Sequence, residues 1–539
     1  MPRIFISDKL EAGGIDLLQA SGLDIDNRPG LKDAALRDAI QIADGMIVRS
    51  GTKVTAQLLE NPGKLRAIVR AGVGVDNIDV AAATRKGIVV MNTPGGNTIS
   101  TAEQTITLMM ALARHTPAAD ASIRLNKWDR TKFVGTQLAG KTLGVVGLGR
   151  IGREVARRAV ALDMRVIGFD PFFSPDFAGK LGIDTVSDLP SLLPHIDFLT
   201  VHTPLSPETT NLIGAAQIGL MKKGSRILNC ARGGIINEQA LADALQSGHL
   251  AGAALDVFVQ EPPPADHPLL KLPNVVVTPH LGASTTEAQE TVALDAARLL
   301  IDYLTKGAVQ FAVNMAAIDR AELEEVRLYV DMARRLGLLH AQMAQGAIRK
   351  ATLTYKGDLA GKKTRLLTAA FTAGLLEGRV EGVNLVNAEL VARERGIEIV
   401  AGANPKKGDF AAAMQADVET EKKSYTAAGT LFGDQYLRLV QLGPYRMESF
   451  LDGTLLVFTH RDVPGLIGFV GTVFGRHGVN IASMTVGRQG SAPGGEAIGV
   501  LNLDSVPPAA ALAELTHPQL SSVTVVKLPK AGESPGWLG

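Results

Sequence analysis

Short apolar runs alternate with longer amphipathic stretches along the first part of the chain. The runs in the first ninety or so residues are Ile4–Ile6, Gly45–Val48, Ala67–Val69 and Ile88–Met91. Stretches with helical spacing, such as Gly14–Ala20 and Leu31–Ile42, lie between them. This alternation predicts a parallel β-sheet covered by helices. The Ala/Met-rich stretch Ser100–Arg114 predicts a helix that is apolar on most faces, and such a helix must be buried in a core or against another subunit.

A second α/β unit begins at the apolar run Leu143–Val146. Its later strands are predicted at Phe198–His202, Arg226–Cys230, Ala253–Val257 and Val275–Thr278. Ligands of open sheets bind beyond the carboxyl ends of the strands, so the residues that follow each run are the ones to inspect. The residues that follow these strands are polar or of the types that enzymes use in catalysis, which places a ligand site at this edge of the sheet.

The remainder of the chain predicts further elements. A helical pattern from Thr286 leads toward Asn314 and is expected to cross back over the first segment. A helix over Ala321–Gly346, a strand over Ala351–Tyr355 and a helix over Leu366–Leu376 follow, with no chemical motif up to residue 450. From Gly453 onward the order is βαββαβ, which is ferredoxin-like.

Length and composition restrict the class of protein. At 539 residues, three or four domains are expected. Lys and Arg total 55 against 54 Asp and Glu, which argues against nucleic acid or an anionic membrane as the main partner. The single cysteine, Cys230, fits a reducing cytoplasm, and the first eight residues resemble a strand more than a signal peptide. No apolar run approaches the roughly 18 residues of a transmembrane helix.

The stretch from Lys141 to Asp170 is a dinucleotide-binding fingerprint. A strand runs into Gly-Leu-Gly-Arg-Ile-Gly, then a helix and a second strand follow. The glycines allow a tight turn, close approach of a pyrophosphate and helix–strand packing. The terminal acid suits a ribose diol and repels a 2′-phosphate, which favours NAD over NADP. The expected cofactor contacts are Gly147, Gly149, Arg150, Ile151, Gly152, Asp170, Thr203, Pro204, Cys230, Ala231, Arg232, Asp256, His280, Gly282 and Ala283.

Three residues have the chemistry needed to assist the oxidation of an alcohol by NAD. His280 follows a strand of the fingerprint unit and could take the hydroxyl proton, since imidazole titrates near pH ~6.5. Glu261 could pair with the imidazole and favour its protonated form. Arg232 could bind a carboxylate as a bidentate fork. The alternatives are a structural histidine and a surface loop glutamate. No metal is required, and the histidine and cysteine spacing offers no zinc site.

Taken together, residues 147–152, Arg232, Glu261 and His280 resemble the D-2-hydroxyacid dehydrogenase family over roughly residues 1–314. The resemblance implies a Rossmann NAD-binding domain (98–286) inserted in a flavodoxin-like substrate domain (1–97 and 287–314). It also implies that the Arg/Glu/His trio is catalytic, and that homodimers or tetramers form through the fingerprint unit. The contacts would then be Ser100–Arg114 and Trp128–Phe133, with Arg130 or Lys132 reaching a neighbour's active site.

Two arginines narrow the expected substrate. Arg49 and Arg70 both follow strands of the first segment, and two such cations suit a phosphate better than a carboxylate alone. Gly72, Val73 and Gly74 leave backbone amides free for a carboxylate. Both segments look like those of family members that oxidise 3-phosphoglycerate. The alternative for the arginines is surface salt bridging, which is common and nearly neutral in energy.

The C-terminal part resembles a regulatory module. His460-Arg461-Asp462 with Asn480 resembles the ACT domain, expected at 453–530, and 315–450 fits an α+β intervening domain by length and order. In serine-inhibited relatives the positions matching His460, Asp462 and Asn480 bind L-serine between two such domains. The aspartate stands where some relatives have asparagine.

The sequence therefore predicts a cytoplasmic NAD-dependent oxidation of D-3-phosphoglycerate to 3-phosphohydroxypyruvate, the first step of serine biosynthesis, with feedback by L-serine. One alternative is a family dehydrogenase for glycerate, glyoxylate or lactate-like acids. Another is an NAD-sensing transcriptional corepressor on the same scaffold, although no DNA-binding motif is visible.

Overall fold

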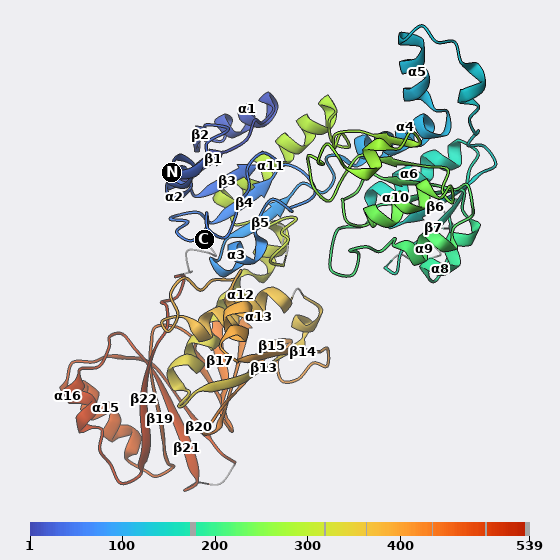
Figure 1. Ribbon diagram of the computed structural model, residues 1–539. Coiled ribbons are helices and arrows are strands. Elements are labelled where there is room, and N and C mark those ends of the chain that lie inside the picture. The colour runs from blue at the N-terminus through green and yellow to red at the C-terminus, as the bar shows by residue number, and fades with distance from the viewer. Residues whose placement is uncertain are drawn as a thin grey trace.

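The computed structural model describes residues 1–172, 179, 181–316, 320–362, 364–433, 435–490 and 493–533. The strands of these residues form four sheets, and the first sheet lies between the second unit and the C-terminal half of the chain (Figure 1). The predicted class is confirmed, with two parallel α/β units, a mixed sheet and a ferredoxin-like sheet.

The first sheet is parallel with the order β2-β1-β3-β4-β5, as in flavodoxin-like folds. Its strands are β1 (Arg3–Ile6), β2 (Asp24–Asn27), β3 (Gly45–Val48), β4 (Ala67–Arg70) and β5 (Val89–Asn92), and its helices are α1 (Ala12–Ala20), α2 (Asp33–Ile42) and α3 (Val80–Arg85). The edge strand β2 was not predicted, because its sequence DIDN contains no apolar run. It is held instead by its pairing with β1 and by Asp26, whose carboxylate binds Arg3 and Arg28.

Helix α11 (Thr286–Lys306) returns the chain to this first sheet, as expected. It packs on α1, β3 and β4, and the Cα of Gly14 approaches it so closely that an added Cβ would lie 2.9 Å from the Ala293 carbonyl oxygen. Beyond α11, Asn314 accepts a hydrogen bond from the Val90 amide at 2.9 Å and donates one to the Ile88 carbonyl at 2.8 Å. The first segment and the region after the second unit therefore build one domain.

The second sheet has seven parallel strands in the order β12-β11-β10-β9-β6-β7-β8. Its strands are β6 (Thr142–Val146), β7 (Arg165–Phe169), β8 (Asp184–Thr185), β9 (Phe198–Val201), β10 (Arg226–Asn229), β11 (Gly252–Leu255) and β12 (Val275–Val277). Its helices are α4 (Thr98–Ala113), α6 (Arg150–Ala161), α8 (Leu189–Leu192), η2 (Leu193–His195), α9 (Ala215–Leu220), α10 (Glu238–Gln246) and η3 (Pro268–Lys271). Separate apolar cores cover its faces, one of which contains α4 and α6.

An arm extends from this unit. It consists of α5 (Thr116–Arg124) and the turn η1 (Arg130–Phe133), and Figure 1 shows α5 away from the strands of the second sheet. None of the residues of α5 is buried. Leu125, Trp128 and Val134 are 67%, 77% and 78% exposed. This is a large apolar surface for a segment that contacts so little of its own chain.

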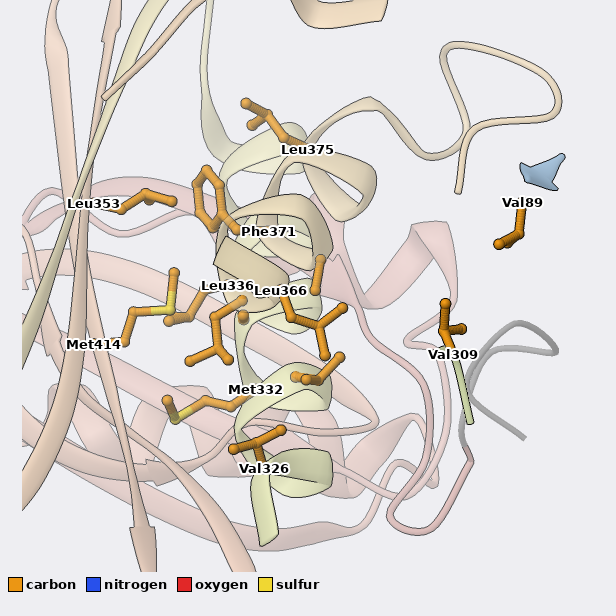
Figure 2. Packing of buried hydrophobic residues seen from close by; sticks show 14 of the residues in the cluster. Val89, Val309, Val326, Met332, Leu336, Leu353, Leu366, Phe371, Leu375 and Met414 are labelled. Atoms are coloured by element: carbon orange, nitrogen blue, oxygen red, sulfur yellow. The ribbon is translucent and has the colours of Figure 1, made fainter. Parts of the chain in front are cut away.

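The third sheet has the order β14-β13-β15-β16-β17-β18 and is antiparallel except for the pair β13–β14. Its elements are β13 (Ile348–Gly357), η4 (Asp358–Gly361), β14 (Glu398–Asn404), β15 (Ala412–Thr420), β16 (Ser424–Phe432), β17 (Tyr436–Leu442), β18 (Tyr445–Phe450), α12 (Arg320–Met343), α13 (Thr364–Leu376) and α14 (Ala388–Glu394). Met332, Leu336 and Phe371 of the two long helices point toward Leu353 and Met414 of the sheet (Figure 2).

The last sheet has the ferredoxin-like order β20-β21-β19-β22. Its elements are β19 (Thr454–Arg461), α15 (Leu466–Arg476), β20 (Ile481–Arg488), β21 (Glu496–Leu503), α16 (Ala509–Glu514) and β22 (Leu520–Lys527). The helices cover one face, and apolar residues on the other join the core built around α12. Arg335 of α12, which is 1% exposed, ties the two parts together by donating to the carbonyl oxygens of Leu451, Pro529 and Lys530.

Two properties of the described part of the chain bear on function. None of its helices is long and apolar enough to cross a membrane. None of its histidine, cysteine and acidic side chains group in a way that would hold a metal ion.

Candidate active site

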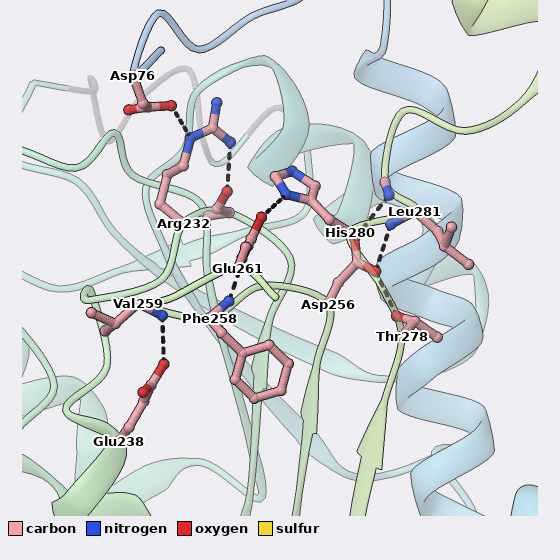
Figure 3. Close-up of polar contacts among 12 residues, drawn as sticks. Asp76, Arg232, Glu238, Asp256, Phe258, Val259, Glu261, Thr278, His280 and Leu281 are labelled. Atoms are coloured by element: carbon pink, nitrogen blue, oxygen red, sulfur yellow. Dashed lines mark hydrogen bonds and ion pairs between the residues drawn. The ribbon is translucent and has the colours of Figure 1, made fainter. Parts of the chain in front are cut away.

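The predicted acid–base pair meets beyond the carboxyl ends of β11 and β12. His280 Nδ1 lies 2.7 Å from Glu261 Oε2 (Figure 3). Glu261 Oε1 also accepts the Phe258 amide at 3.1 Å. Partial burial raises the pKa of the Glu261 carboxyl, but the hydrogen bonds from His280 and Phe258 outweigh burial and lower it below its ordinary value. Because Nδ1 donates to a carboxylate, the remaining ring nitrogen, Nε2, is the one that can accept a proton.

Asp256 fixes the turn that carries His280. The carboxylate, which is 1% exposed, accepts the Thr278 hydroxyl at 2.5 Å and the amides of Leu281 and Gly282 at 2.8 Å each. His280 itself has a left-handed backbone with φ 55°, which costs a non-glycine residue about 1–2 kcal/mol. The buried hydrogen bonds of Asp256 offset this cost and hold the imidazole above the sheet. Both carboxylate oxygens are occupied in this way, although Asp256 was predicted as a cofactor contact.

Arg232 follows β10 and faces the first domain. Its Nε donates to Asp76 Oδ2 at 2.8 Å and its Nη1 to the Ala231 carbonyl at 2.6 Å (Figure 3). A Cβ added at Gly74 would lie 1.7 Å from Arg232 Nη2, so any larger residue there would displace the guanidinium. The guanidinium and the Gly74 backbone are therefore brought together, as the sequence predicted.

The Arg70 guanidinium approaches the same loop. A Cβ at Gly72, where φ is 154°, would lie 2.3 Å from Arg70 Nη1. Burial, and next the positive charge of Arg232, lowers the pKa of Arg70 to about 10. Its buried Nε has no hydrogen-bond partner.

The other predicted substrate residues already have partners. Arg49 Nη1 donates to the Lys9 carbonyl at 3.1 Å. Val73, the third residue predicted on this loop, offers its carbonyl to the Asn92 side chain.

The fingerprint loop fits the pyrophosphate and ribose of a dinucleotide. Gly147 has φ 92°, and a Cβ at Gly152 would lie 1.9 Å from the Gly147 carbonyl oxygen. At Gly149 nothing lies within 4 Å of an added Cβ, which leaves space in front of the first amides of α6, near Arg150 and Ile151. Asp170 directly follows β7 and accepts the Leu148 amide at 2.8 Å. The acid therefore lies directly beside the glycine loop.

The remaining predicted cofactor residues line the same edge of the second sheet. Thr203 Oγ1 is buried without a partner, and the Pro204 carbonyl accepts the Thr209 hydroxyl at 2.6 Å. Cys230 is buried, which raises the pKa of its thiol to about 12 and keeps it protonated. The Gly282 carbonyl accepts the Ser100 hydroxyl at 2.7 Å, and Ala283 is half-buried beside it.

Three contributors to the site were missed from sequence. Asp76 binds Arg232, Asn77 donates to the Arg49 and Thr52 carbonyls at 2.7 Å each, and Glu238 accepts the Val259 amide at 2.7 Å. The only sign in the sequence is that Asp76 and Asn77 lie two and three residues after Gly74, and Glu238 has none.

The three residues predicted to bind serine do not meet within one chain. Asp462 pairs with Arg488 at 2.7 Å, and His460 is buried against Phe458 with Nε2 unpartnered. Asn480 donates to Asp504 at 2.7 Å. His460 pairs with Ala497 of β21, and Ile481, next to Asn480, pairs with Leu503 at the other end of β21. At the usual rise per residue of a strand, Asn480 therefore lies about 20 Å from His460 along the sheet.

Comparisons with known proteins agree with this organisation. Residues 106–282 match the NAD-binding domain of D-isomer specific 2-hydroxyacid dehydrogenases, 325–443 the D-3-phosphoglycerate dehydrogenase intervening domain, and 454–516 the ACT domain. D-3-phosphoglycerate dehydrogenase of Methanocaldococcus jannaschii is 42% identical, covering 98% of this chain and 100% of the relative. That of Bacillus subtilis is 40% identical with the same coverage.

A solved structure also matches a large part of this chain. A glyoxylate reductase from Paecilomyes thermophila, 29% identical, covers 58% of this chain and 98% of its own, with a TM-score of 0.54. This match covers little more than half of the chain and supports the fold rather than the substrate. The two relatives above cover nearly the whole chain, including its C-terminal domains. On this evidence the chain belongs to the D-3-phosphoglycerate dehydrogenase family of NAD-binding D-isomer specific 2-hydroxyacid dehydrogenases.

Proposed function

We propose that this enzyme oxidises D-3-phosphoglycerate to 3-phosphohydroxypyruvate with NAD, the first step of serine biosynthesis. The observation that carries the proposal is the joint approach of Arg70 and Arg232 to the backbone of Gly72 and Gly74. A substrate with a carboxylate and a phosphate needs two cationic groups close together. The unpartnered Nε of buried Arg70 supports this role over surface salt bridging.

His280 and Glu261 act on the substrate hydroxyl. His280 Nε2 takes the proton from the C2 hydroxyl group, and Glu261 stabilises the imidazolium that results. Bound NAD supplies the two-electron oxidant that this alcohol oxidation requires. Arg232 Nη2 and the Gly72–Gly74 amides hold the carboxylate, while Arg49 and Arg70 hold the phosphate. No metal takes part in this scheme.

NAD is preferred over NADP in this proposal. The Asp170 carboxylate beside the Leu148 amide suits a ribose diol and repels a 2′-phosphate. The same fifteen residues predicted from the sequence form the cofactor site, with Asp256 acting through the turn that it anchors.

The experiment that tests the reaction is NADH consumption with 3-phosphohydroxypyruvate beside unphosphorylated hydroxypyruvate. A large preference for the phosphorylated substrate is expected. Equal rates would point to a glycerate or glyoxylate enzyme of the same family. Tight NADH binding with no turnover of either acid would favour the corepressor alternative.

Regulation by L-serine is the second part of the proposal. Asp462 and Asn480 lie at opposite ends of the edge strand β20, which has no hydrogen-bonded neighbour on one side within the described chain. If two copies pair their β20 edges antiparallel, Asn480 of one approaches His460 of the other. Serine binding there would bias the hinge between the substrate and cofactor domains.

Two measurements test this regulation. L-Serine should lower the rate of the intact enzyme, and Asn480→Ala should remove that response. A serine titration that changes neither the rate nor NADH binding would eliminate the proposal.

We also propose that the enzyme is a homodimer or homotetramer. The exposed arm with Trp128, and the exposed side chains of Leu270, Val277 and Leu281 near His280, are apolar surfaces that a second copy would cover. Arg130 or Lys132 of the arm would then lie near the partner's site. Sedimentation of the native enzyme and of Trp128→Ser tests this, with dissociation expected for the variant.

The domain limits and compartment complete the proposal. The substrate domain comprises 1–97 and 287–314, the NAD-binding domain 98–286, the intervening domain 315–450 and the ACT domain 453–530. A single cysteine fits the reducing conditions of the cytoplasm.

A further inference from the structure

An ion pair joins the two halves of the catalytic cleft. Asp76 belongs to the loop after β4 in the first sheet, and Arg232 follows β10 in the second, 156 residues later. Asp76 Oδ2 accepts Arg232 Nε at 2.8 Å (Figure 3). Asp76 is 60% exposed and Arg232 25% exposed, so the pair lies open to the cleft.

The donors of Arg232 are divided among distinct partners. Nε is taken by Asp76 and Nη1 by the Ala231 carbonyl at 2.6 Å. Nη2 remains, and it lies against the Gly74 backbone. When Nε and Nη1 are both engaged, only Nη2 is available to a ligand. The contact with Asp76 therefore determines that Nη2 faces the substrate loop.

Asp76 also offsets the repulsion between two like charges. The charge of Arg232 disfavours the charged form of Arg70, whereas the charge of Asp76 favours it. Without Asp76, two guanidiniums near Gly72 and Gly74 would repel each other without a counter-charge between them. The carboxylate therefore allows both cations to stay in one small site.

The backbone under each partner is held by other groups. Asn77 donates to the carbonyls of Arg49 and Thr52, and Asp79 caps α3 by accepting the Ala82 amide at 2.8 Å. Asn229 donates to the Arg232 carbonyl at 2.8 Å. Removing the Asp76 side chain should thus leave both loops in place.

We propose that Asp76 is a positioning residue for the reaction, which orients the Arg232 guanidinium toward the substrate carboxylate across the domain cleft. This inference rests on the proposed role of Arg232. An amide oxygen can replace the carboxylate as acceptor for Nε but not as the counter-charge, so Asp76→Asn should raise KM less than Asp76→Ala, which loses both.

The test compares Asp76→Ala, Asp76→Asn, Arg232→Ala and the double variant, with Asp184→Asn as the control. Asp184 forms an ion pair with Arg165 at 2.9 Å on the far edge of the second sheet. For Asp76→Ala, KM for 3-phosphohydroxypyruvate should rise about 10- to 100-fold, the cost of a misplaced binding group. NADH affinity and the thermal midpoint should stay at the native values, and the double variant should be no worse than Arg232→Ala.

Each contrary outcome has a separate meaning. An unchanged KM in Asp76→Ala, or losses that multiply in the double variant, would overturn the positioning role. A fall in thermal midpoint with equal loss of NADH affinity would also overturn it, because it would show a structural role only. If Arg232→Ala itself kept full activity, the proposed function of Arg232 would fail instead.

Discussion

Glu261 Oε2 lies 2.7 Å from His280 Nδ1, which leaves Nε2 as the ring nitrogen available for proton transfer. A carboxylate at this distance stabilises the imidazolium more than the neutral ring. Reduction of the keto acid requires the imidazolium as proton donor, and oxidation of the hydroxy acid requires the neutral base. The pair therefore serves both directions of the reaction.

Replacing Glu261 with Gln should slow both directions of the reaction. The imidazolium, which forms during oxidation and donates the proton during reduction, loses its carboxylate partner. The maximal rate should drop about 10- to 100-fold, within the range attributed to general acid–base catalysis. Initial rates measured in both directions across the pH range check this.

Glu238→Gln is the matched control for that variant. Glu238 forms a second Glu–His pair nearby, with His267 Nε2 at 3.1 Å, and it binds the Val259 amide of the same loop. Its rates should stay near the native values, because glutamine keeps an acceptor oxygen for the Val259 amide. A Glu261→Gln enzyme that also keeps the native rates would contradict the assignment of the catalytic pair.

Asp170 should control the choice between NADH and NADPH. Its carboxylate accepts the amides of Leu148 and Phe172 at 2.8 and 2.9 Å. Asp170→Asn retains an acceptor oxygen for the Leu148 amide but removes the charge that repels a 2′-phosphate. We expect the NADH/NADPH affinity ratio to fall about tenfold, which corresponds to roughly 1.4 kcal/mol. Fluorescence titration of both cofactors measures it, and an unchanged ratio would show that the charge of Asp170 does not select the cofactor.

The sequence allowed the sheets to be predicted where apolar runs and glycine spacing carry the information. Strands such as β6 and β9 are buried runs, and Gly147 with Gly152 marks a loop that only glycine can form. Strand β2 was missed because Asp26 is held by arginines rather than by burial of apolar surface.

The supporting contacts of the site were less predictable. Residue types pointed to His280, Glu261 and Arg232, since the chemistry demands a base, an acid and a cation. Asp76 binds a residue 156 positions away, and this approach depends on how two separate sheets face each other. No local pattern encodes it.

Arg70 should distinguish phosphorylated from unphosphorylated substrate. Arg70→Gln removes a cation beside Gly72. The loss in kcat/KM for 3-phosphohydroxypyruvate should be about 10- to 100-fold, because a charge-assisted hydrogen bond contributes about 1.5–3 kcal/mol. The value for hydroxypyruvate should change far less. Arg66→Gln is the control. Arg66 directly precedes β4, at the opposite end of the strand from Arg70, and its guanidinium lies 3.6 Å from the Asp44 carboxylate. Equal losses on both substrates would contradict a phosphate contact.

His340 should make the intervening domain sensitive to acid. The ring lies in the core, 2% exposed, with its centroid 5.9 Å from that of Phe371 and with Nε2 unpartnered. Burial lowers the pKa of His340 to about 4, although Asp417 and the Ala416 backbone act in the opposite direction. The unfolded chain, with a histidine pKa near ~6.5, therefore binds more protons than the folded chain between these values.

It follows that stability falls as pH decreases from about 6.5 toward 4. Between about pH 7.5 and pH 5 this one group should cost on the order of 2 kcal/mol. Glutamine does not titrate. Acidification should therefore lower the free energy of opening of α12 by about 2 kcal/mol less in His340→Gln than in the native protein. Hydrogen exchange of the α12 amides at the two pH values measures it, because exchange reports local opening. The amides of β6 in the cofactor domain serve as the internal control and should respond alike in both proteins. An identical acid response of α12 in native and variant protein would show that His340 does not bind the extra proton on unfolding.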